Sequence, residues 1–240
     1  MLVDVGSDKE FQDYCDRMEQ RLHNRMFPIL ATGIRLHMTK SATAAQHYVQ
    51  QRGQPVLVRH YKQIYKDVYT ATFHQMRKQA RTGSGQFIES MLSWIQSRAA
   101  RLIQNISQST MDYIRDRIMI GVAAGQSNDK ISRDIYDDAN AISRWRAATI
   151  ARTETHTAAM QAMNDTIEDQ GIEVRTKTWQ TSGDDRVRDS HVGMDGETVG
   201  YDEPFSNGMM FPGDGDDPDE VINCRCTVAY NTETQESVQE

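Results

Sequence analysis

The sequence predicts an α+β protein, in which a mostly α-helical N-terminal region precedes a small α+β C-terminal domain. As far as about residue 170, apolar residues recur at the three- and four-residue steps of a helix face. After Gly171 the period becomes two and turn-forming glycine and proline become frequent. The charge changes too, because residues 1–150 hold 21 Lys and Arg against 14 Asp and Glu, whereas residues 151–240 hold 6 against 20. We therefore expect three parts: a helical region (1–125), a compact domain (126–230) and a polar tail (231–240).

Four helices are expected in the helical region, over residues 7–40, 38–52, 56–80 and 87–124. Pro28 disfavours helical geometry at the residue before it, so the first helix should kink or break there. Gly53 and Pro55 should end the second helix, and Gly125 should end the fourth. A turn is expected at 82–85. The aromatic and methionine side chains of these helices should form a core rather than a cofactor pocket.

Further helices and then strands are expected downstream of Gly125. A short helix near 130–136 and a turn near 138–141 should lead into a long helix with Trp145, His156 and Met163 on its buried stripe. Such a pair also resembles a DNA-binding helix-turn-helix, although most pairs of this kind are simply packed helices. The long helix should cover 144–170, and strands are expected at 172–181, 198–199, 221–222 and 224–230.

Composition excludes several classes of protein. Hydrophobic residues make up 38% of the chain, charged residues 25%, and the mean hydropathy is -0.67. No apolar run approaches the roughly 20 residues that span a bilayer, and the N-terminus lacks the pattern of a signal peptide, so no membrane contact is expected. A bridge between Cys224 and Cys226 would close a strained ring, and the third cysteine is distant in sequence. Reduced thiols are therefore expected.

Cys224, Cys226 and His191 are the candidate metal ligands. If residues 223–227 are extended, side chains two apart share a face, so the two sulfurs point the same way. The Gly- and Pro-rich segment before them could fold back and bring in His191. Thiolate and imidazole suit a structural zinc ion, which takes four ligands. The fourth could come from Asp185, Asp189, Asp195 or His156. The alternative is a pair of small buried thiols beside a hydrogen-bonded histidine.

Other chemistry in this part of the chain has weaker support. A catalytic pair of His191 with a cysteine lacks a recognisable orienting residue. The acidic loop 214–220 could hold calcium but lacks the EF-hand spacing. Arg152 and Glu154 are two apart on a helix and cannot contact each other. Each could reach the C-terminal domain, or both could lie in solvent.

Basic residues concentrate between Arg52 and Arg101. The stretch 52–101 holds 9 Lys and Arg against 2 Asp and Glu, and includes Arg77, Lys78 and Arg81. Such a stretch indicates a surface for nucleic acid or for an acidic protein. The alternative is a set of solvated helix faces.

A succession of short motifs in the second half of the chain resembles a known family. In order these are A-R-T-E (151–154), Trp179 followed by Asp185 and the arginines of 186–188, H-x3-D-G (191–196), P-G-D (212–214) and N-C-R-C (223–226). Over about residues 120–228 this order and spacing are similar to those of the phage Mu F-type minor head proteins, the head-morphogenesis proteins of tailed phages. Many members of that family carry C-x2-C where this chain has Arg188 and His191, which removes one candidate zinc ligand and keeps another.

The resemblance implies a structural minor capsid protein of a tailed phage or prophage, and no enzyme. Such a protein lies in the virion head, is assembled in the host cytoplasm, and acts near the portal vertex in head assembly and in genome packaging or delivery. Its expected partners are the portal protein, the major capsid protein or both, with packaged DNA contacted through residues 52–101. The alternative function is a metal-dependent nuclease or hydrolase, in which His191 and nearby aspartates act on a metal-bound water.

Overall fold

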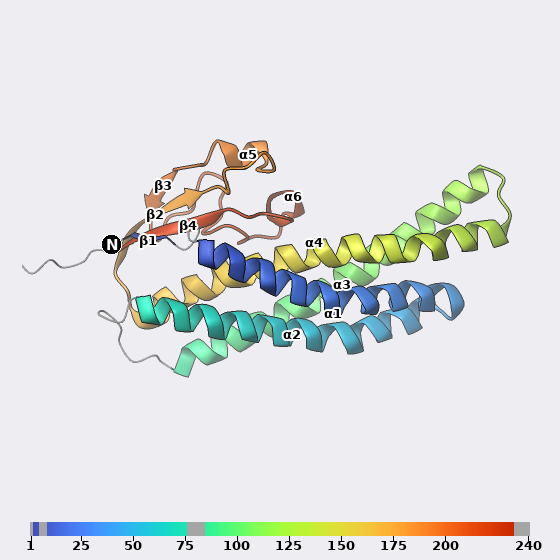
Figure 1. Ribbon diagram of the computed structural model, residues 1–240, viewed down its shortest axis with the longest axis horizontal. Coiled ribbons are helices and arrows are strands. Elements are labelled where there is room, and N and C mark those ends of the chain that lie inside the picture. The colour runs from blue at the N-terminus through green and yellow to red at the C-terminus, as the bar shows by residue number, and fades with distance from the viewer. Residues whose placement is uncertain (1, 5–8, 76–84, 233–240) are drawn as a thin grey trace, which may run out of the picture. The chain divides into compact units, whose positions relative to one another are not determined.

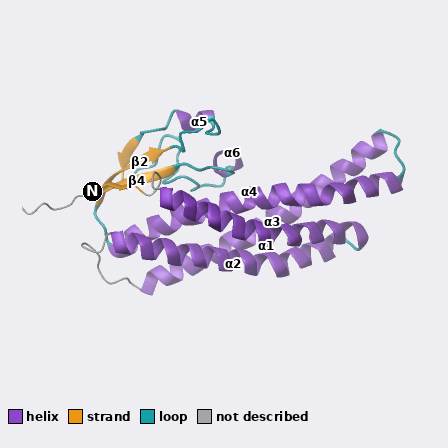
Figure 2. Cartoon of the chain, in the orientation of Figure 1, coloured by secondary structure: helices purple, strands orange, loops and turns teal. Residues whose placement is uncertain are grey.

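The computed structural model describes residues 2–4, 9–75 and 85–232 (Figure 1). Helices make up most of it, and the strands form one small sheet (Figure 2), so the predicted α+β class is confirmed. The elements follow the chain as β1 (Leu2–Asp4), α1 (Lys9–Thr39), α2 (Ala42–Gln75), α3 (Gly85–Ala123), α4 (Asn128–Gln170), β2 (Val174–Gln180), α5 (Asp189–Val192), β3 (Thr198–Gly200), α6 (Pro218–Val221) and β4 (Thr227–Thr232).

These elements form two compact units, and the long helices contribute to both. The helical unit comprises Met18–Lys62 and Leu92–Ala151. The sheet unit comprises Met1–Arg17, Gln63–Met91 and Arg152–Glu240. Among the described residues, none of the helices is both long and apolar enough to cross a membrane. Residues 82–84 of the turn expected at 82–85, the basic residues Arg77, Lys78 and Arg81, and most of the 231–240 tail lie outside the described residues, while Gly85 begins α3.

Pro28 lies inside α1, which runs unbroken to Thr39, so a break at this proline is wrong. Proline removes one backbone hydrogen bond, the bond to the carbonyl of Asn24, at a cost of about 3 kcal/mol. Pro28 is exposed, while Met26 and Leu30 beside it are buried. Burying each such side chain contributes roughly 1.5–3 kcal/mol, which outweighs the cost of the proline.

Gly53 and Pro55 lie inside α2, so the two helices expected over 38–52 and 56–80 are one. A Cβ atom on Gly53 would lie 2.9 Å from Cδ1 of Ile103 and 3.6 Å from Cε of Met26. The missing side chain thus lets α1, α2 and α3 pack closely. The glycine serves packing here, not termination of the helix.

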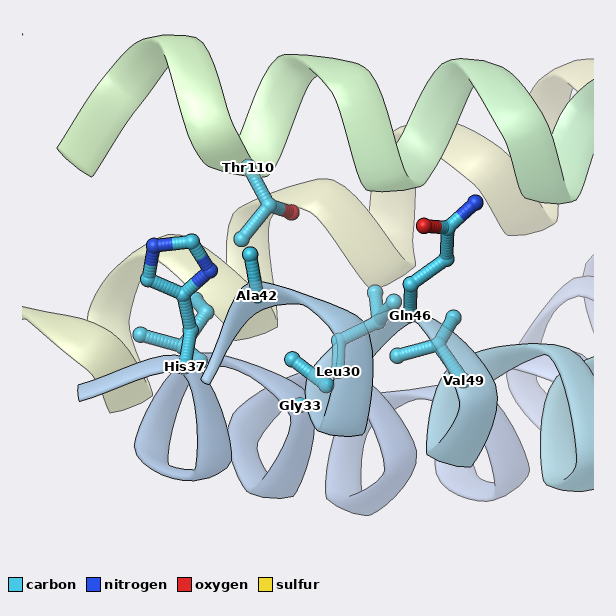
Figure 3. A pocket seen from close by; sticks show the side chains of 9 residues that line it. Leu30, Gly33, His37, Ala42, Gln46, Val49 and Thr110 are labelled. Atoms are coloured by element: carbon cyan, nitrogen blue, oxygen red, sulfur yellow. The ribbon is translucent and has the colours of Figure 1, made fainter. Parts of the chain in front are cut away.

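A second close approach joins α1 to α2 (Figure 3). A Cβ atom on Gly33 would lie 2.5 Å from Cγ2 of Val49. Beside this contact, Leu30, Ala42 and Thr110 line a pocket with a volume of about 20 Å³. Such a volume holds about one water molecule, so the pocket is a packing defect and not a ligand site.

The end of α3 agrees with the sequence, whereas the division of the next helix does not. Gly125 has φ +67°, and the amide of Gln126 donates to the carbonyl of Gly121 at 2.9 Å, which ends α3 as predicted. The turn expected near 138–141 is absent because α4 is continuous there. Buried residues at four-residue intervals carry the helix through this point: Ile131, Ile135, Ala139, Ser143 and Ala147.

A continuous α4 removes the likeness to a helix-turn-helix, because no turn separates two helices. His156 and Met163 are buried on α4 as predicted. Trp145 is 68% exposed, so its expected place on the buried stripe is wrong. The buried stripe passes through Ser143 and Ala147 on either side of it, which leaves Trp145 pointing outward.

The sheet is antiparallel with the strand order β1-β4-β2-β3. Buried and less buried side chains alternate along β2, as predicted. Lys177 and Trp179 are buried, whereas Thr176 and Thr178 are only partly buried. The strands expected at 172–181 and 198–199 correspond to β2 and β3, and the closing strand starts at Thr227, later than expected. The N-terminal strand β1 pairs with β4, with Leu2 opposite Asn231.

The strand expected at 221–222 is wrong, because Val221 ends the short helix α6. The side chain of Asp217 accepts a hydrogen bond from the amide of Asp219 at 3.0 Å, as a residue before the first turn does. Pro218 then occupies the first helical position, where its fixed φ suits a helix. Capping by Asp217 and Pro218 therefore favours a helix here, although the apolar residues Val221 and Ile222 had indicated a strand.

Candidate metal centre

The structure brings His191, Cys224 and Cys226 together within the sheet unit. Nδ1 of His191 lies 3.7 Å from Sγ of Cys224 and 3.4 Å from Sγ of Cys226. The three ligand atoms lie within 4.8 Å of one another, and all three residues are buried. The cysteines occupy the irregular segment before β4, where Asn223 has a φ of 58°. Ile222 and Asn223 form a turn, and the two cysteines follow it in a segment that is not part of the expected strand.

The other side of the His191 ring is held by a carboxylate and an indole. Nε2 lies 2.7 Å from Oε2 of Glu220, at the end of α6. The ring packs edge-on against Trp179 of β2, with centroids 5.1 Å apart. Only 1% of the His191 side chain is exposed, so the ring cannot rotate without disrupting these contacts.

The cluster favours a charged pair in the absence of other ligands. Burial alone would lower the pKa of His191, but the hydrogen bond and charge of Cys224, with Glu220, outweigh it and raise that pKa. The hydrogen bond with Cys226 lowers the pKa of Cys224, against the effect of its burial. The same interaction, together with burial, raises the pKa of Cys226. The shifts of His191 and Cys224 therefore both favour the charged forms of these two groups.

His156 of α4 is the one candidate fourth ligand that is buried. It hydrogen-bonds the backbone of Cys226, and burial lowers its pKa, so that the ring is neutral. Nε2 of this ring has no hydrogen-bond partner among the described residues. By contrast, Asp185 and Asp189 are exposed. Asp195 accepts hydrogen bonds from the amide and hydroxyl of Thr181, at 2.8 and 2.9 Å.

The start of the second half of α4 holds the segment that carries the cysteines. Arg152 donates from Nη1 to Oδ1 of Asn223 at 3.2 Å, and Oγ1 of Thr153 accepts from the Asn223 amide at 3.0 Å. Arg152 therefore contacts the C-terminal domain, which was one of the two alternatives for the A-R-T-E motif; the other was exposure to solvent. Glu154 is 4% exposed, so the solvated pair is wrong.

Two further arginines fix the same segment from the other side. Nη2 of Arg225 lies 2.8 and 2.6 Å from the two carboxylate oxygens of Asp184, and Arg188 donates to the carbonyl of Ile222 at 2.6 Å. Hydrogen bonding to Arg225 holds the pKa of the Asp184 carboxyl well below its usual range. Residues 222–226 are thus held by contacts from α4, from the β2–α5 loop and from α5.

The P-G-D motif lets the long loop approach α4. Gly213 has φ +86°, and a Cβ atom there would lie 2.8 Å from Oγ1 of Thr157. Both the backbone angle and the space therefore require glycine. Within the acidic loop 214–220, Asp214 accepts from the amide of Met210, Asp217 caps α6 and Glu220 holds His191. These carboxylates already serve protein donors, which argues against the calcium alternative.

Sequence reasoning missed Glu220, Asp184 and Asn223 as parts of the site. Asp217–Pro218 is a recognisable helix start, and recognising it would have placed Glu220 on a helix rather than in a solvated loop. No spacing signal connects Asp184 with Arg225, 41 residues away. The left-handed φ of Asn223 suits asparagine better than most residues, but this preference is too common to single it out.

The basic stretch 52–101 is described only in part. In the helical unit, Arg52, Arg59 and Lys62 of α2 are exposed. Arg98 of α3 is half-buried, with its guanidinium 5.7 Å from the ring centroid of Trp94. Some of the positive charge therefore faces solvent, and some stabilises an aromatic contact.

Comparison with known proteins connects this geometry to a family. Residues 112–229 match the family model described as Phage Mu protein F like protein. The chain is 28% identical over 146 residues to the uncharacterized protein YqbB of Bacillus subtilis, covering 58% of this chain and 47% of YqbB. It is 29% identical over 129 residues to an uncharacterized protein of Haemophilus influenzae, covering 52% of this chain and 26% of the relative.

A third relative is the NAD(+)--arginine ADP-ribosyltransferase EFV of Enterococcus faecalis, 31% identical over 120 residues. The match covers 48% of this chain but 24% of the transferase, so this chain spans under half of each of the three relatives. No solved structure matches the chain. The matched family region contains A-R-T-E and N-C-R-C, which contact each other through Asn223, and P-G-D, which approaches α4 at Thr157. Residues 112–229, just under half of the chain, therefore belong to the phage Mu F-like family of head-morphogenesis proteins.

Proposed function

We propose that this protein is a structural minor capsid protein of a tailed phage or prophage, which acts at the portal vertex in head assembly and in genome packaging or delivery. The observation that carries this proposal is the family match over 112–229. The contacts around 222–226 support it, because they hold α4, the β2–α5 loop and the segment before β4 together. An assembly protein must hold its contact surfaces in fixed positions. It does not need an open catalytic site to do so.

An exposed apolar surface supports a protein partner. At the end of α3, Met119, Ile120 and Val122 are 63%, 60% and 61% exposed, and Ile118 beside them is 44% exposed. Contiguous apolar side chains in solvent mark contact sites more often than isolated ones do. We assign this end of α3 to contact with the portal protein or the major capsid protein.

Reconstruction of the virion without imposed icosahedral symmetry tests the assignment. Density for this chain at the portal vertex, in few copies, is the expected result. Density spread over all capsomers, or none in the head, would contradict it. A parallel binding assay uses Met119→Ser/Ile120→Ser/Val122→Ser against purified portal and major capsid proteins. Loss of one interaction identifies the partner, and Trp145→Ser, which alters another exposed apolar residue, is the matched control.

Packaged DNA is a second partner that we propose, through the basic stretch. Arg52, Arg59 and Lys62 are exposed on one helix, and their spacings of seven and three residues place them on one side of it. Phosphate contacts would be independent of sequence and steeply dependent on salt. If DNA binding is absent at low salt, or ignores salt, these residues do not form a DNA surface.

The alternative function, a metal-dependent nuclease or hydrolase, has less support from the geometry. A catalytic metal needs an open position for water and substrate. His191 is 1% exposed, with one ring nitrogen at the sulfurs and the other at Glu220. Metal-dependent DNA cleavage by the purified protein, lost in His191→Ala, would favour the enzyme. The activity named for the E. faecalis relative stays with that protein, since the matched part is a quarter of its length.

A further inference from the structure

We propose that His156, His191, Cys224 and Cys226 bind one zinc ion, which fastens α4, α5 and the segment before β4 to one another. This site goes beyond the proposed function and does not depend on it. A zinc ion would act here as a cross-link in a domain whose cysteines are free thiols.

The separations of the ligand atoms fit tetrahedral zinc. Zn–N bonds of about 2.0–2.1 Å and Zn–S bonds of about 2.3 Å, at a tetrahedral angle, give an N···S separation of about 3.6 Å. The two observed separations from Nδ1 of His191 are 3.4 and 3.7 Å. A single N–H bond can point at only one sulfur, whereas a shared ion accounts for both distances equally.

The contact with Glu220 decides which nitrogen of His191 can bind metal. Nε2 lies 2.7 Å from the carboxylate, so this nitrogen carries a proton. In the neutral ring, Nδ1 is then a lone pair that faces the two sulfurs. Histidine ligands of metals commonly donate their other N–H to a carboxylate, which fixes the tautomer and strengthens the ligand.

His156 supplies the fourth ligand because its free nitrogen has no other use in the fold. The ring is buried, its bond to the backbone of Cys226 restrains it, and its Nε2 has no hydrogen-bond partner among the described residues. Leaving such a buried atom unsatisfied costs roughly 1–3 kcal/mol. His156 lies outside the cluster of His191, Cys224 and Cys226, so binding the ion requires its side chain to move toward Cys224.

Charge balance favours the same ion. Two thiolates and two neutral imidazoles carry a charge that Zn²⁺ neutralises, so the buried site becomes neutral overall. Zinc binding releases the protons of the two thiols, and the ion gives the two buried sulfurs and the two buried histidines a shared partner.

The test measures metal in the full-length protein, expressed with zinc and freed of loose metal by dialysis. We expect close to one zinc per chain, and Co²⁺ replacement should give thiolate charge-transfer bands with the intense visible bands of tetrahedral cobalt. Cys224→Ser/Cys226→Ser should abolish both signals. Cys15→Ser, which changes the other buried cysteine, is the matched control and should retain both.

Two further variants separate the ligands from their supports. Glu220→Gln should keep one zinc at saturation but weaken its affinity about 10–100-fold. His156→Ala should weaken binding at least as much and shift the visible cobalt bands, while the thiolate bands remain. His60→Ala is the control for loss of a buried histidine. Metal-free wild-type protein, or an octahedral cobalt spectrum, overturns the site. Unchanged affinity in His156→Ala overturns the fourth ligand.

Discussion

Replacing His60 by glutamine should make the protein more resistant to mild acid. His60 lies in the helical unit, on α2, and is 4% exposed. Burial, and then the charge of Arg25, lower the pKa of its imidazole from 6.5 to about 3. In the unfolded chain His60 binds a proton near pH 6.5, whereas in the folded chain it stays unprotonated at this pH. The folded state therefore loses stability as the pH falls below 6.5.

The size of this effect follows from the two pKa values. Above pH 7 both states are neutral at His60 and the contribution is close to zero. Each pH unit between 6.5 and 3 then costs about 1.4 kcal/mol. Between pH 7.5 and pH 5.0 the loss from this residue is about 2 kcal/mol, or roughly a 30-fold rise in the unfolding equilibrium constant.

Urea unfolding, followed by helical circular dichroism at pH 7.5 and 5.0, measures the difference. Wild-type protein should lose about 2 kcal/mol more than His60→Gln over this interval. His47→Gln is the control, because His47 is exposed on the same helix and stays hydrated in both states. Equal losses in wild type and His60→Gln would refute the reasoning, since His60 would then gain its proton without unfolding.

Three other changes have defined outcomes. Pro28→Ala should raise the free energy of unfolding by about 1–3 kcal/mol, since an exposed position regains a helical hydrogen bond, and a lower midpoint in urea would contradict this. Cys224→Ser should reduce hydrogen-exchange protection in 172–230 more than in 18–62 and 92–151, whereas equal losses would argue against separate units. Arg52→Gln/Arg59→Gln/Lys62→Gln should reduce the slope of log affinity for DNA against log salt by about 2–3, and an unchanged slope would remove these residues from any DNA surface.

Helix periodicity predicted most of the helical residues and the end of α3, but the sequence analysis divided helices that are continuous. Pro28, Gly53 and Pro55 are local stop signals of about 1–3 kcal/mol each, and they were expected to divide helices. In the structure, the buried stripes on either side continue through them. The free energy of burying these stripes therefore outweighs the low helix propensity of proline and glycine. The two contributions cannot be compared from the sequence, because the helices that pack against each stripe are not yet known.

The candidate site shows a different limit. Cys224, Cys226 and His191 were found because few residue types bind soft metals. Glu220 and Asp184 were not, because carboxylates are common on any acidic surface and gain meaning only from what they touch. His156 was one of four candidates for the same role, and its burial is what sets it apart from the three aspartates.

The pairing of β1 with β4 has a consequence for the order in which the chain folds. Leu2 pairs with Asn231, so β1 cannot find its partner until nearly the whole described chain has been synthesised. The helices need no such wait, because their hydrogen bonds are local and form in about a microsecond. Until β4 is made, the edge of β1 is open to strands of neighbouring nascent chains. Synthesis of many copies on one messenger thus carries a risk of strand exchange, which slow translation of the residues between β1 and β4 would increase.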